Sequence, residues 1–366
     1  MKIVVAMSGG VDSSVTAGLL VEEGHEVIGL AMKTHALEPK HNRACCTPDD
    51  MRDARRVADI LNVPFYVLNY AELFAREVVQ PFAEAYRQGR TPNPCVECND
   101  KVKFRPLLER AELLGADKLA TGHYARIAGE GGALTLMRGV DLNKDQTYFL
   151  YRLQQEQLQR LLFPLGGMHK TEVREHARRL GLPLAEKHES QEICFVGDEG
   201  YAATVEKYGG GGKSGIFVDQ DGRKLGEHDG VHRFTLGQRR GLGIAAPMPL
   251  YVNHIDAESG DVHVGDRSSL LAHAIEVKNA GWTLEPPALG RIISVRQRYR
   301  EAPRAGRISS ISEDGKNFRI TFDEPEPRGA PGQAAVLYDG DVVLGGGVIE
   351  GAVRRRPLAV LQDAHG

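Results

Sequence analysis

Residues 4–20, VVAMSGGVDSSVTAGLL, constrain the fold of this chain more than any other stretch. An apolar run at residues 4–7 predicts a buried strand, and an apolar helical pattern follows directly. A glycine-rich turn between a strand and a helix suits a phosphate, because successive backbone N–H groups and the positive helix end face one anion. This stretch therefore predicts a phosphate site at residues 8–14, which we call the glycine loop.

Strand-like and helix-like segments continue to alternate up to about residue 200. After the first strand and a helix at 13–23, strands are predicted at 25–32, 64–70 and 117–127, and helices at 49–61, up to about 86, and at 99–115. This alternation is typical of βαβ units with parallel strands. The sequence therefore predicts an α/β fold with a doubly wound parallel sheet.

The pattern changes after a glycine run at residues 209–215, GGGGKSG, which indicates a domain boundary. Beyond it, short β-like segments are separated by turn residues at regular intervals, as in antiparallel barrels. We therefore expect a catalytic α/β domain, a small linker domain that contacts the substrate, and a C-terminal antiparallel β-barrel. Their expected bounds are 1–205, 206–275 and 276–366.

The composition is that of a globular protein, with 42% hydrophobic and 26% charged residues. No window approaches the roughly 18 uninterrupted apolar residues of a membrane span, and the first residues lack a leader pattern. We therefore expect a cytoplasmic protein with no membrane partner. The net charge of −3 excludes a globally basic nucleic-acid binder, although local basic patches can still bind one.

Five cysteines form a sparse, odd-numbered set: Cys45, Cys46, Cys95, Cys98 and Cys194. In a cytoplasmic chain such a set favours catalysis, redox chemistry or metal binding over a disulfide framework. Cys95 and Cys98 form a C-x-x-C motif behind two prolines, which predicts a shaped, exposed loop. Two alternatives remain open here: a structural zinc site on the first four cysteines, and a buried apolar role for Cys194.

Residues 291–307 contain six arginines and a single acid, Glu301. A solvated charged face is the usual interpretation of such a run. Here Tyr299 is interleaved with the arginines, and a flat aromatic ring beside basic groups suits an RNA backbone and an unstacked base. Lys144, Arg239 and Arg240 are candidates to extend this basic patch.

Two further strings imitate nucleotide-binding motifs. Gly212-Lys213-Ser214 lacks the strand that precedes a Walker loop, and GLGIAA at residues 241–246 leads into prolines instead of a helix. Both are therefore predicted to be ordinary loops.

Six strings, in order and spanning nearly the whole chain, together resemble the tRNA-specific 2-thiouridylase family. They are MSGGVDSSV, TPNPC with the following CN and VKF, ATGHYAR, KDQTYFL, SQEICFV and FTLGQRRGLG. The first string by itself is similar to the pyrophosphatase loop of N-type ATP pyrophosphatases, which transfer AMP from ATP to an oxygen. The resemblance implies a first domain like the adenine-nucleotide alpha hydrolases.

The resemblance also implies site residues. ATP, with Mg²⁺, would bind at Ala6, Met7, Ser8, Gly9, Gly10, Val11, Asp12, Ser13, Ser14, Met32 and Gly122. Cys98 matches one nucleophile of the family, and Cys194 matches the cysteine that carries a persulfide. The role of Asp12 stays open between a helix cap and a Mg²⁺ ligand.

The implied macromolecular partners are a tRNA, bound at the anticodon stem-loop with its wobble uridine, and a protein that carries persulfide sulfur. Expected tRNA contacts are Asn93, Pro94, Cys95, His123, Lys144, Asp145, Gln146, Arg298, Tyr299 and Gln333. The implied activity is 2-thiolation: ATP adenylates the 2-oxygen of the uridine, and a sulfur nucleophile then displaces AMP.

One departure from the family affects the chemistry. Many members have Asp where this chain has Cys95. Three nearby thiolates can hold an iron–sulfur cluster, so two sulfur sources stay open: a persulfide on Cys194, or a cluster on Cys95, Cys98 and Cys194. A different adenylating ligase with the same glycine loop is the remaining alternative, but it would need neither the cysteines nor the basic β-domain.

Overall fold

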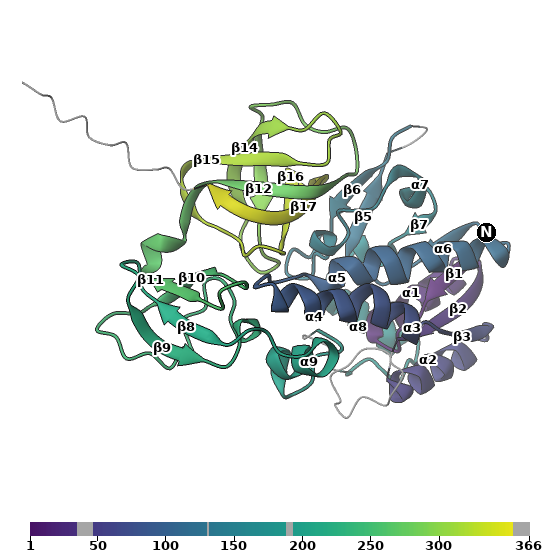
Figure 1. Cartoon of the computed structure of the whole chain (residues 1–366). Helices are drawn as coiled ribbons and strands as arrows, with labels where there is room; N and C mark the ends of the chain where they lie inside the picture. The colour runs from purple at the N-terminus through teal and green to yellow at the C-terminus, as the bar shows by residue number, and fades with distance from the viewer. Residues whose placement is uncertain (35–46, 130–131, 188–192, 354–366) are drawn as a thin grey trace, which may run out of the picture.

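A computed structural model describes residues 1–34, 47–129, 132–187 and 193–353, which form three parts (Figure 1). They are an α/β part, a small β part, and a barrel. Within these ranges, no helix combines the length and the apolar composition needed to cross a membrane.

The α/β part is built on a parallel sheet with the strand order β3-β2-β1-β4-β7. Its strands are β1 (Lys2–Ala6), β2 (Glu26–Lys33), β3 (Phe65–Asn69), β4 (Lys118–Ala120) and β7 (Leu161–Leu162). Ile3 and Val5 pack into one apolar cluster, and Val4 packs into another on the opposite face. Both faces of β1 are therefore buried, which confirms the predicted doubly wound parallel sheet.

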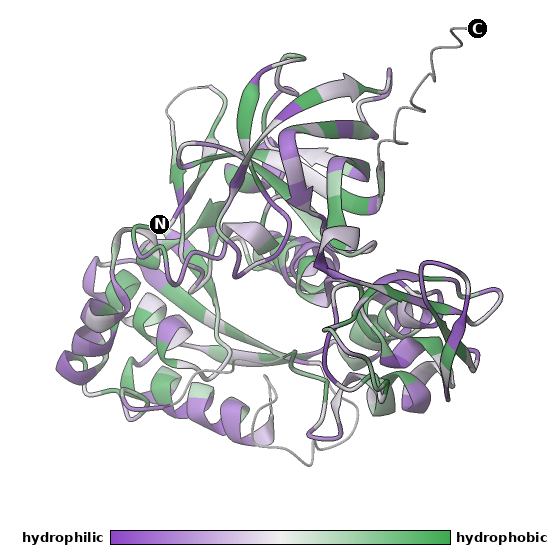
Figure 2. Ribbon diagram, turned by 90° about the vertical axis from the view of Figure 1, so that its left-hand side faces the viewer, coloured by the Kyte–Doolittle hydropathy of each residue, from purple (hydrophilic) through white to green (hydrophobic). Residues whose placement is uncertain are grey.

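Helices cover both faces of this sheet and carry hydrophilic residues on their outer sides (Figure 2). The helices of this part of the chain are α1 (Val11–Glu22), α2 (Pro48–Ile60), α3 (Ala71–Phe74), α4 (Gln80–Arg87), α5 (Pro94–Glu97), α6 (Arg105–Leu113), α7 (Gln155–Leu158) and α8 (Lys170–Arg179). Two π-helical segments, η1 (Ala75–Val79) and η2 (Cys98–Phe104), interrupt the regular helices. Such segments are rare and often occur at functional sites.

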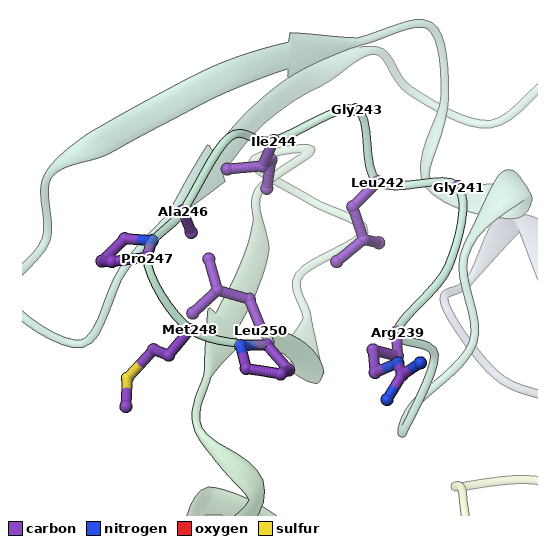
Figure 3. A pocket seen from close by; sticks show the side chains of 10 residues that line it. Arg239, Gly241, Leu242, Gly243, Ile244, Ala246, Pro247, Met248 and Leu250 are labelled. Carbon is purple, nitrogen blue, oxygen red and sulfur yellow. The ribbon is translucent and has the colours of Figure 1, made fainter.

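The small β part begins with α9 (Gly200–Gly209) and has the strand order β10-β11-β8-β9. Its strands are β8 (Gly215–Val218), β9 (Lys224–His228), β10 (Tyr251–Ile255) and β11 (Val262–Gly265). The GLGIAA string lies in an irregular loop that lines an open pocket with Arg239, Met248 and Leu250 (Figure 3). As predicted, neither Gly212-Lys213-Ser214 nor the GLGIAA string leads into a helix.

The third part is a closed antiparallel barrel, because its first strand, β12, pairs with both β15 and its last strand, β17. Its strands are β12 (Leu271–Trp282), β13 (Ile292–Arg296), β14 (Arg304–Ile311), β15 (Phe318–Pro327), β16 (Ala334–Asp339) and β17 (Val342–Val353). This closure confirms the predicted antiparallel barrel. Short 3-10 turns complete the chain: η3 (Thr147–Phe149), η4 (Pro164–Gly167), η5 (Val231–Arg233) and η6 (Arg267–Leu270).

The prediction of a single strand at residues 117–127 is wrong. The strand breaks after β4, and the chain resumes as β5 (Ala125–Ala128), which forms a hairpin with β6 (Thr135–Arg138). The break lies at Gly122, where an added Cβ would come within 2.8 Å of the Asp12 backbone. Because β6 pairs with β17, this hairpin extends the barrel's sheet and not the parallel one.

Asp145 joins the hairpin to the barrel from the interior. Its carboxylate accepts from Arg138 of β6 at 3.2 Å and from Arg296 of β13 at 3.3 Å, and its side chain is 0% exposed. The Thr147 hydroxyl donates to the same group at 2.7 Å. The expected tRNA contact of Asp145 is therefore corrected: a fully enclosed carboxylate binds the two parts of the protein together.

We expect Asp145→Ala to lower the free energy of unfolding by about 3–5 kcal/mol, because it leaves two arginines without their buried carboxylate. Asp341→Ala is the matched control, since Asp341 pairs with Arg126 at an exposed site. It should change stability by about 1 kcal/mol or less. Thermal and urea unfolding measure both variants, and equal losses would contradict the assignment.

Candidate functional site

The glycine loop joins β1 to α1 at the carboxyl edge of the parallel sheet, where open α/β sheets bind ligands. Gly9 has φ of +73°, and an added Cβ would lie 2.0 Å from the carbonyl oxygen of Asp50 in α2. Only glycine fits there, because a side chain would be both strained and in collision with the helix. The loop is thereby pressed against the start of α2.

The N-terminus of α1 has no side-chain cap. Gly10 occupies the cap position in an extended conformation, and no side chain there bonds the helix N–H groups. The hydroxyls of Ser13 and Ser14 instead donate to the Gly10 carbonyl at 3.2 and 2.8 Å. The Ser13 oxygen also accepts from the backbone N–H of Ser8 at 3.1 Å. An uncapped helix start of this kind is available to an anion.

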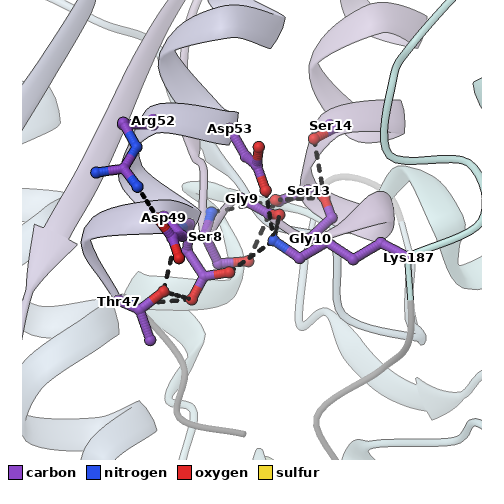
Figure 4. A network of polar contacts seen from close by, with 11 residues as sticks. Ser8, Gly9, Gly10, Ser13, Ser14, Thr47, Asp49, Arg52, Asp53 and Lys187 are labelled. Atoms are coloured by element: carbon purple, nitrogen blue, oxygen red, sulfur yellow. Dashed lines mark hydrogen bonds and ion pairs between the residues drawn. The ribbon is translucent and has the colours of Figure 1, made fainter. Parts of the chain in front are cut away.

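Lys187 ties the glycine loop to α2 (Figure 4). Its ammonium donates to the Gly9 carbonyl at 2.9 Å and to the carboxylates of Asp50 and Asp53, both at 2.7 Å. Burial opposes the charge of this ammonium, but the two carboxylates raise the pKa of Lys187 above its usual value. The three N–H donors of this ammonium are therefore engaged in holding the glycine loop against α2.

Asp12 is not a helix cap. Its Oδ1 accepts from the Lys170 ammonium at 2.6 Å and from the Tyr124 hydroxyl at 3.0 Å. The cap interpretation is therefore wrong, and this carboxylate oxygen is engaged by an ammonium and a hydroxyl group. Lys170 is absent from the residues predicted from sequence, because no local motif marks the first residue of α8 as a neighbour of the glycine loop.

The remaining predicted nucleotide residues surround the same edge. Gly122 would collide with the backbone of Asp12 and Ser13 at 2.8 Å if it carried a Cβ, so the end of β4 lies against the start of α1. Met32 is buried near the end of β2, next to β1. The Met7 N–H donates to the Leu30 carbonyl at 2.8 Å, which extends the parallel pairing to the loop itself. Ala6 ends β1 and Val11 begins α1.

Cys98 and Cys194 pack on one apolar group, which we call the cysteine cluster. Its buried members are Phe74, Val78, Val79 and Val102, and both cysteines lie against it with part of their surface exposed. Neither is in a disulfide. The cluster joins the two π-helical segments, because Val78 and Val79 belong to η1 while Cys98 and Val102 belong to η2. It brings together two cysteines that are far apart in the sequence.

Cys95 lies in α5, one turn before Cys98, with Asn93 at the cap position and Pro94 as the first helical residue. Cys45 and Cys46, proposed above for zinc, lie outside the described residues. Among the residues that the structure does describe, no three His, Cys, Asp or Glu side chains are grouped so as to hold a metal ion.

The barrel holds the segment that precedes the C-x-x-C motif. The Gln333 amide donates to the carbonyls of Thr91 and Pro92 at 2.9 and 3.3 Å. Arg90 forms an ion pair with Glu350 at 2.9 Å, and its hydrogen bond lowers the pKa of Glu350. Gln333 thus lies beside the C-x-x-C motif, where its amide holds the backbone of Thr91 and Pro92.

His123 lies between Phe104 and Phe163, with ring centroids 5.6 and 6.1 Å away. Burial, and then the charge of Lys103, lowers the pKa of His123 to about 3. Its Nδ1 is 2.7 Å from the Thr121 hydroxyl. A neutral imidazole is therefore available at the carboxyl edge of the sheet near pH 7.

The other predicted tRNA residues lie on both sides of the junction between the α/β part and the barrel. Lys144, Gln146 and Arg298 keep part of their surface exposed. The Gln146 side-chain oxygen accepts from the Tyr124 N–H at 3.0 Å. Tyr299 packs against Phe149 at 4.5 Å between ring centroids, so one of its faces is already covered.

The net positive charge around the arginine run is lower in the folded protein than its sequence suggests. Carboxylates lie close to five of its members: Arg291 pairs with Asp339, Arg296 with Asp145, Arg304 with Glu326 and Arg307 with Asp323, while Arg298 lies 3.6 Å from Glu301. The count of acids within residues 291–307 missed all of these partners except Glu301, because the others come from β15, β16 and the segment before η3.

The pKa of His123 predicts a pH dependence of stability. Below pH 6.5 the unfolded chain binds a proton at this histidine, whereas the folded chain does not until about pH 3. Its contribution to stability is therefore lost as the pH falls below about 6.5. In thermal unfolding from pH 7 to 5, His123→Gln should lose less stability than the unmodified chain. Parallel curves for the two proteins would contradict this assignment.

Sequence profiles of known families match almost the entire chain. They are described as "tRNA methyl transferase HUP domain" for residues 1–198, "tRNA methyl transferase PRC-barrel domain" for 203–266, and "Aminomethyltransferase beta-barrel domain" for 272–349.

Similar curated proteins carry the name tRNA-specific 2-thiouridylase MnmA. One from Geobacter metallireducens is 51% identical over 96% of this chain and 97% of its own length. One from Geotalea uraniireducens is 50% identical over 97% of this chain and 96% of its own length. One from Leptospira biflexa is 44% identical over 97% of this chain and 95% of its own length.

Proposed function

The chain belongs to the tRNA-specific 2-thiouridylase family, and from that premise we propose that it uses ATP to replace the 2-oxygen of a tRNA wobble uridine with sulfur. The observation that carries the proposal is the cysteine cluster, which joins Cys98 and Cys194 within a domain that also holds an uncapped phosphate loop. A thiolating enzyme needs both features, because the oxygen must be activated before sulfur can displace it.

The first step uses the glycine loop. ATP lies with its phosphates at the start of α1, and the uridine 2-oxygen attacks the α-phosphorus. Pyrophosphate leaves and stays bound by the backbone N–H groups of the loop, which Lys187 holds in place through the Gly9 carbonyl. The product carries AMP on the 2-oxygen, which turns an unreactive oxygen into a good leaving group.

The second step uses the cysteines. A protein carrier transfers its outer persulfide sulfur to the Cys194 thiolate and keeps a thiol. The Cys98 thiolate then attacks the inner sulfur of that persulfide, forming a Cys98–Cys194 disulfide and releasing sulfide. Sulfide attacks C2 of the activated uridine and expels AMP, and a thiol reductant restores the two cysteines. The partly exposed positions of both cysteines support this exchange.

Mg²⁺ would neutralise phosphate charge on the bound ATP. One carboxylate oxygen of the candidate ligand Asp12 is bound to the Lys170 ammonium. The iron–sulfur alternative requires three clustered thiolates, and no such group occurs among the described residues.

Methyl transfer is the second candidate, because the matched profiles carry that description. The cysteine cluster favours thiolation, since the transfer of a methyl group requires no pair of cysteines on one surface. Incubation of the purified chain with tRNA, ATP, a sulfur donor and a methyl donor, followed by mass spectrometry of the nucleosides, separates the two. 2-Thiouridine is the expected product, and a methylated nucleoside would overturn the proposal.

Cys194→Ser should abolish 2-thiouridine formation while leaving ATP binding unchanged, because the variant lacks the cysteine that receives the persulfide sulfur but keeps the glycine loop. Nucleoside mass spectrometry and calorimetric ATP titration measure the two effects. Retained thiolation would refute the role of Cys194.

Cys95→Ser distinguishes the two sulfur sources. Partial thiolation by this variant supports the persulfide, whereas complete loss of thiolation points to a three-cysteine cluster.

Arg298→Ala should weaken tRNA binding several-fold and leave ATP affinity unchanged, because its partly exposed guanidinium can reach a phosphate. Filter binding at two salt concentrations measures the effect, which should shrink at high salt. Arg319→Ala is the control, since Arg319 pairs with Glu276 outside the arginine run. Equal loss of tRNA and ATP binding would indicate misfolding instead.

A further inference from the structure

Asp12 raises an electrostatic problem at the proposed ATP site. It is in the first turn of α1, and the positive end of that helix is where the phosphates are expected to lie. A carboxylate there repels a polyphosphate and competes with it for the same helix end. A basic partner that neutralises the charge of Asp12 and holds its carboxylate elsewhere removes this repulsion.

The structure does both through Lys170. The ammonium lies 2.6 Å from Asp12 Oδ1, and the Tyr124 hydroxyl donates to the same oxygen. Correspondingly, no side chain caps α1. The carboxylate that would otherwise occupy this helix end is held toward α8 and β5, and the backbone N–H groups at the helix start remain available to an anion.

Lys170 is itself held in place. It is the first residue of α8, its side chain is 11% exposed, and its ammonium lies over the Tyr124 ring at 5.8 Å. Its backbone N–H donates to the Asp141 carboxylate at 3.1 Å. The ammonium is therefore held at a fixed place beside Asp12.

We propose that Lys170 is a positioning residue for ATP, which acts by neutralising Asp12 and holding its carboxylate away from the start of α1. The inference rests on the proposed function in taking ATP as the ligand of the glycine loop. The alternative is that Lys170 moves to the phosphates and binds them directly. The two differ in what happens when Asp12 also loses its charge.

The experiment is a double-mutant cycle of Lys170→Met and Asp12→Asn, with calorimetric titration of ATP into each purified full-length variant. Lys170→Met leaves an unpaired carboxylate beside the phosphates and should weaken ATP binding on the order of 10- to 100-fold. Asp12→Asn should bind ATP at least as tightly as the unmodified chain. The double variant should recover to within about threefold of the unmodified chain, since no unpaired carboxylate remains.

Three results would overturn the inference. A double variant as weak as Lys170→Met would show that the ammonium binds phosphate itself. An unchanged affinity of Lys170→Met would remove any role for Lys170. A loss in Asp12→Asn equal to that in Lys170→Met would show that ATP binding needs the carboxylate. If instead the unmodified chain bound no ATP, the proposed function itself would fail. The experiment therefore distinguishes failure of the proposed function from failure of the role of Lys170.

Two controls guard against effects on folding. Lys2→Met removes an ammonium that pairs with Glu26 at the amino end of β1, opposite the glycine loop, and should leave ATP affinity unchanged. Lys170→Gln is the second variant if Lys170→Met does not fold, and it should show the same loss of affinity and the same rescue by Asp12→Asn. Thermal unfolding of each variant confirms that the titrated protein is folded.

Discussion

The buried carboxylate of Asp145 is the interaction on which the arrangement of this protein depends. It pairs with Arg138 of the β5–β6 hairpin and with Arg296 of the barrel, so an α/β part and a β part share one enclosed ion pair. Because burying unpaired charge is costly, this network allows few relative positions of the two parts. The barrel then reaches the segment before the C-x-x-C motif through Gln333 and Glu350.

The barrel helps to position the cysteine cluster. The Gln333 amide holds the backbone of Thr91 and Pro92, which leads directly into α5 and the π-helical segment that begins at Cys98. From a later part of the chain, Cys194 and Phe195 also pack on this cluster. The two cysteines are thus positioned by segments that lie far apart in the sequence, whereas the glycine loop is positioned by its contacts with α2, β4 and α8.

Much of this was predictable from sequence where the physics is local. The run of apolar residues before Ser8 and the helical pattern after it specify a strand, a turn and a helix without reference to the rest of the chain. The prediction of one strand at 117–127 was wrong, because Gly122 must approach the start of α1 and the chain has to turn there. The charge of the arginine run was overestimated, because the carboxylates that neutralise it lie on neighbouring strands.

The sequence by itself determined the α/β fold, the barrel, the phosphate loop and the family, since each depends on periodicity or on residues close together in the chain. Only the tertiary structure decided how Asp12 and Asp145 act. Both are aspartates in motifs that suggested ligand contacts, yet each carboxylate is bound by a basic side chain that lies far away in the sequence, Lys170 for Asp12 and Arg296 for Asp145. Which partner a charged group finds is set by long-range packing, and no local pattern encodes it.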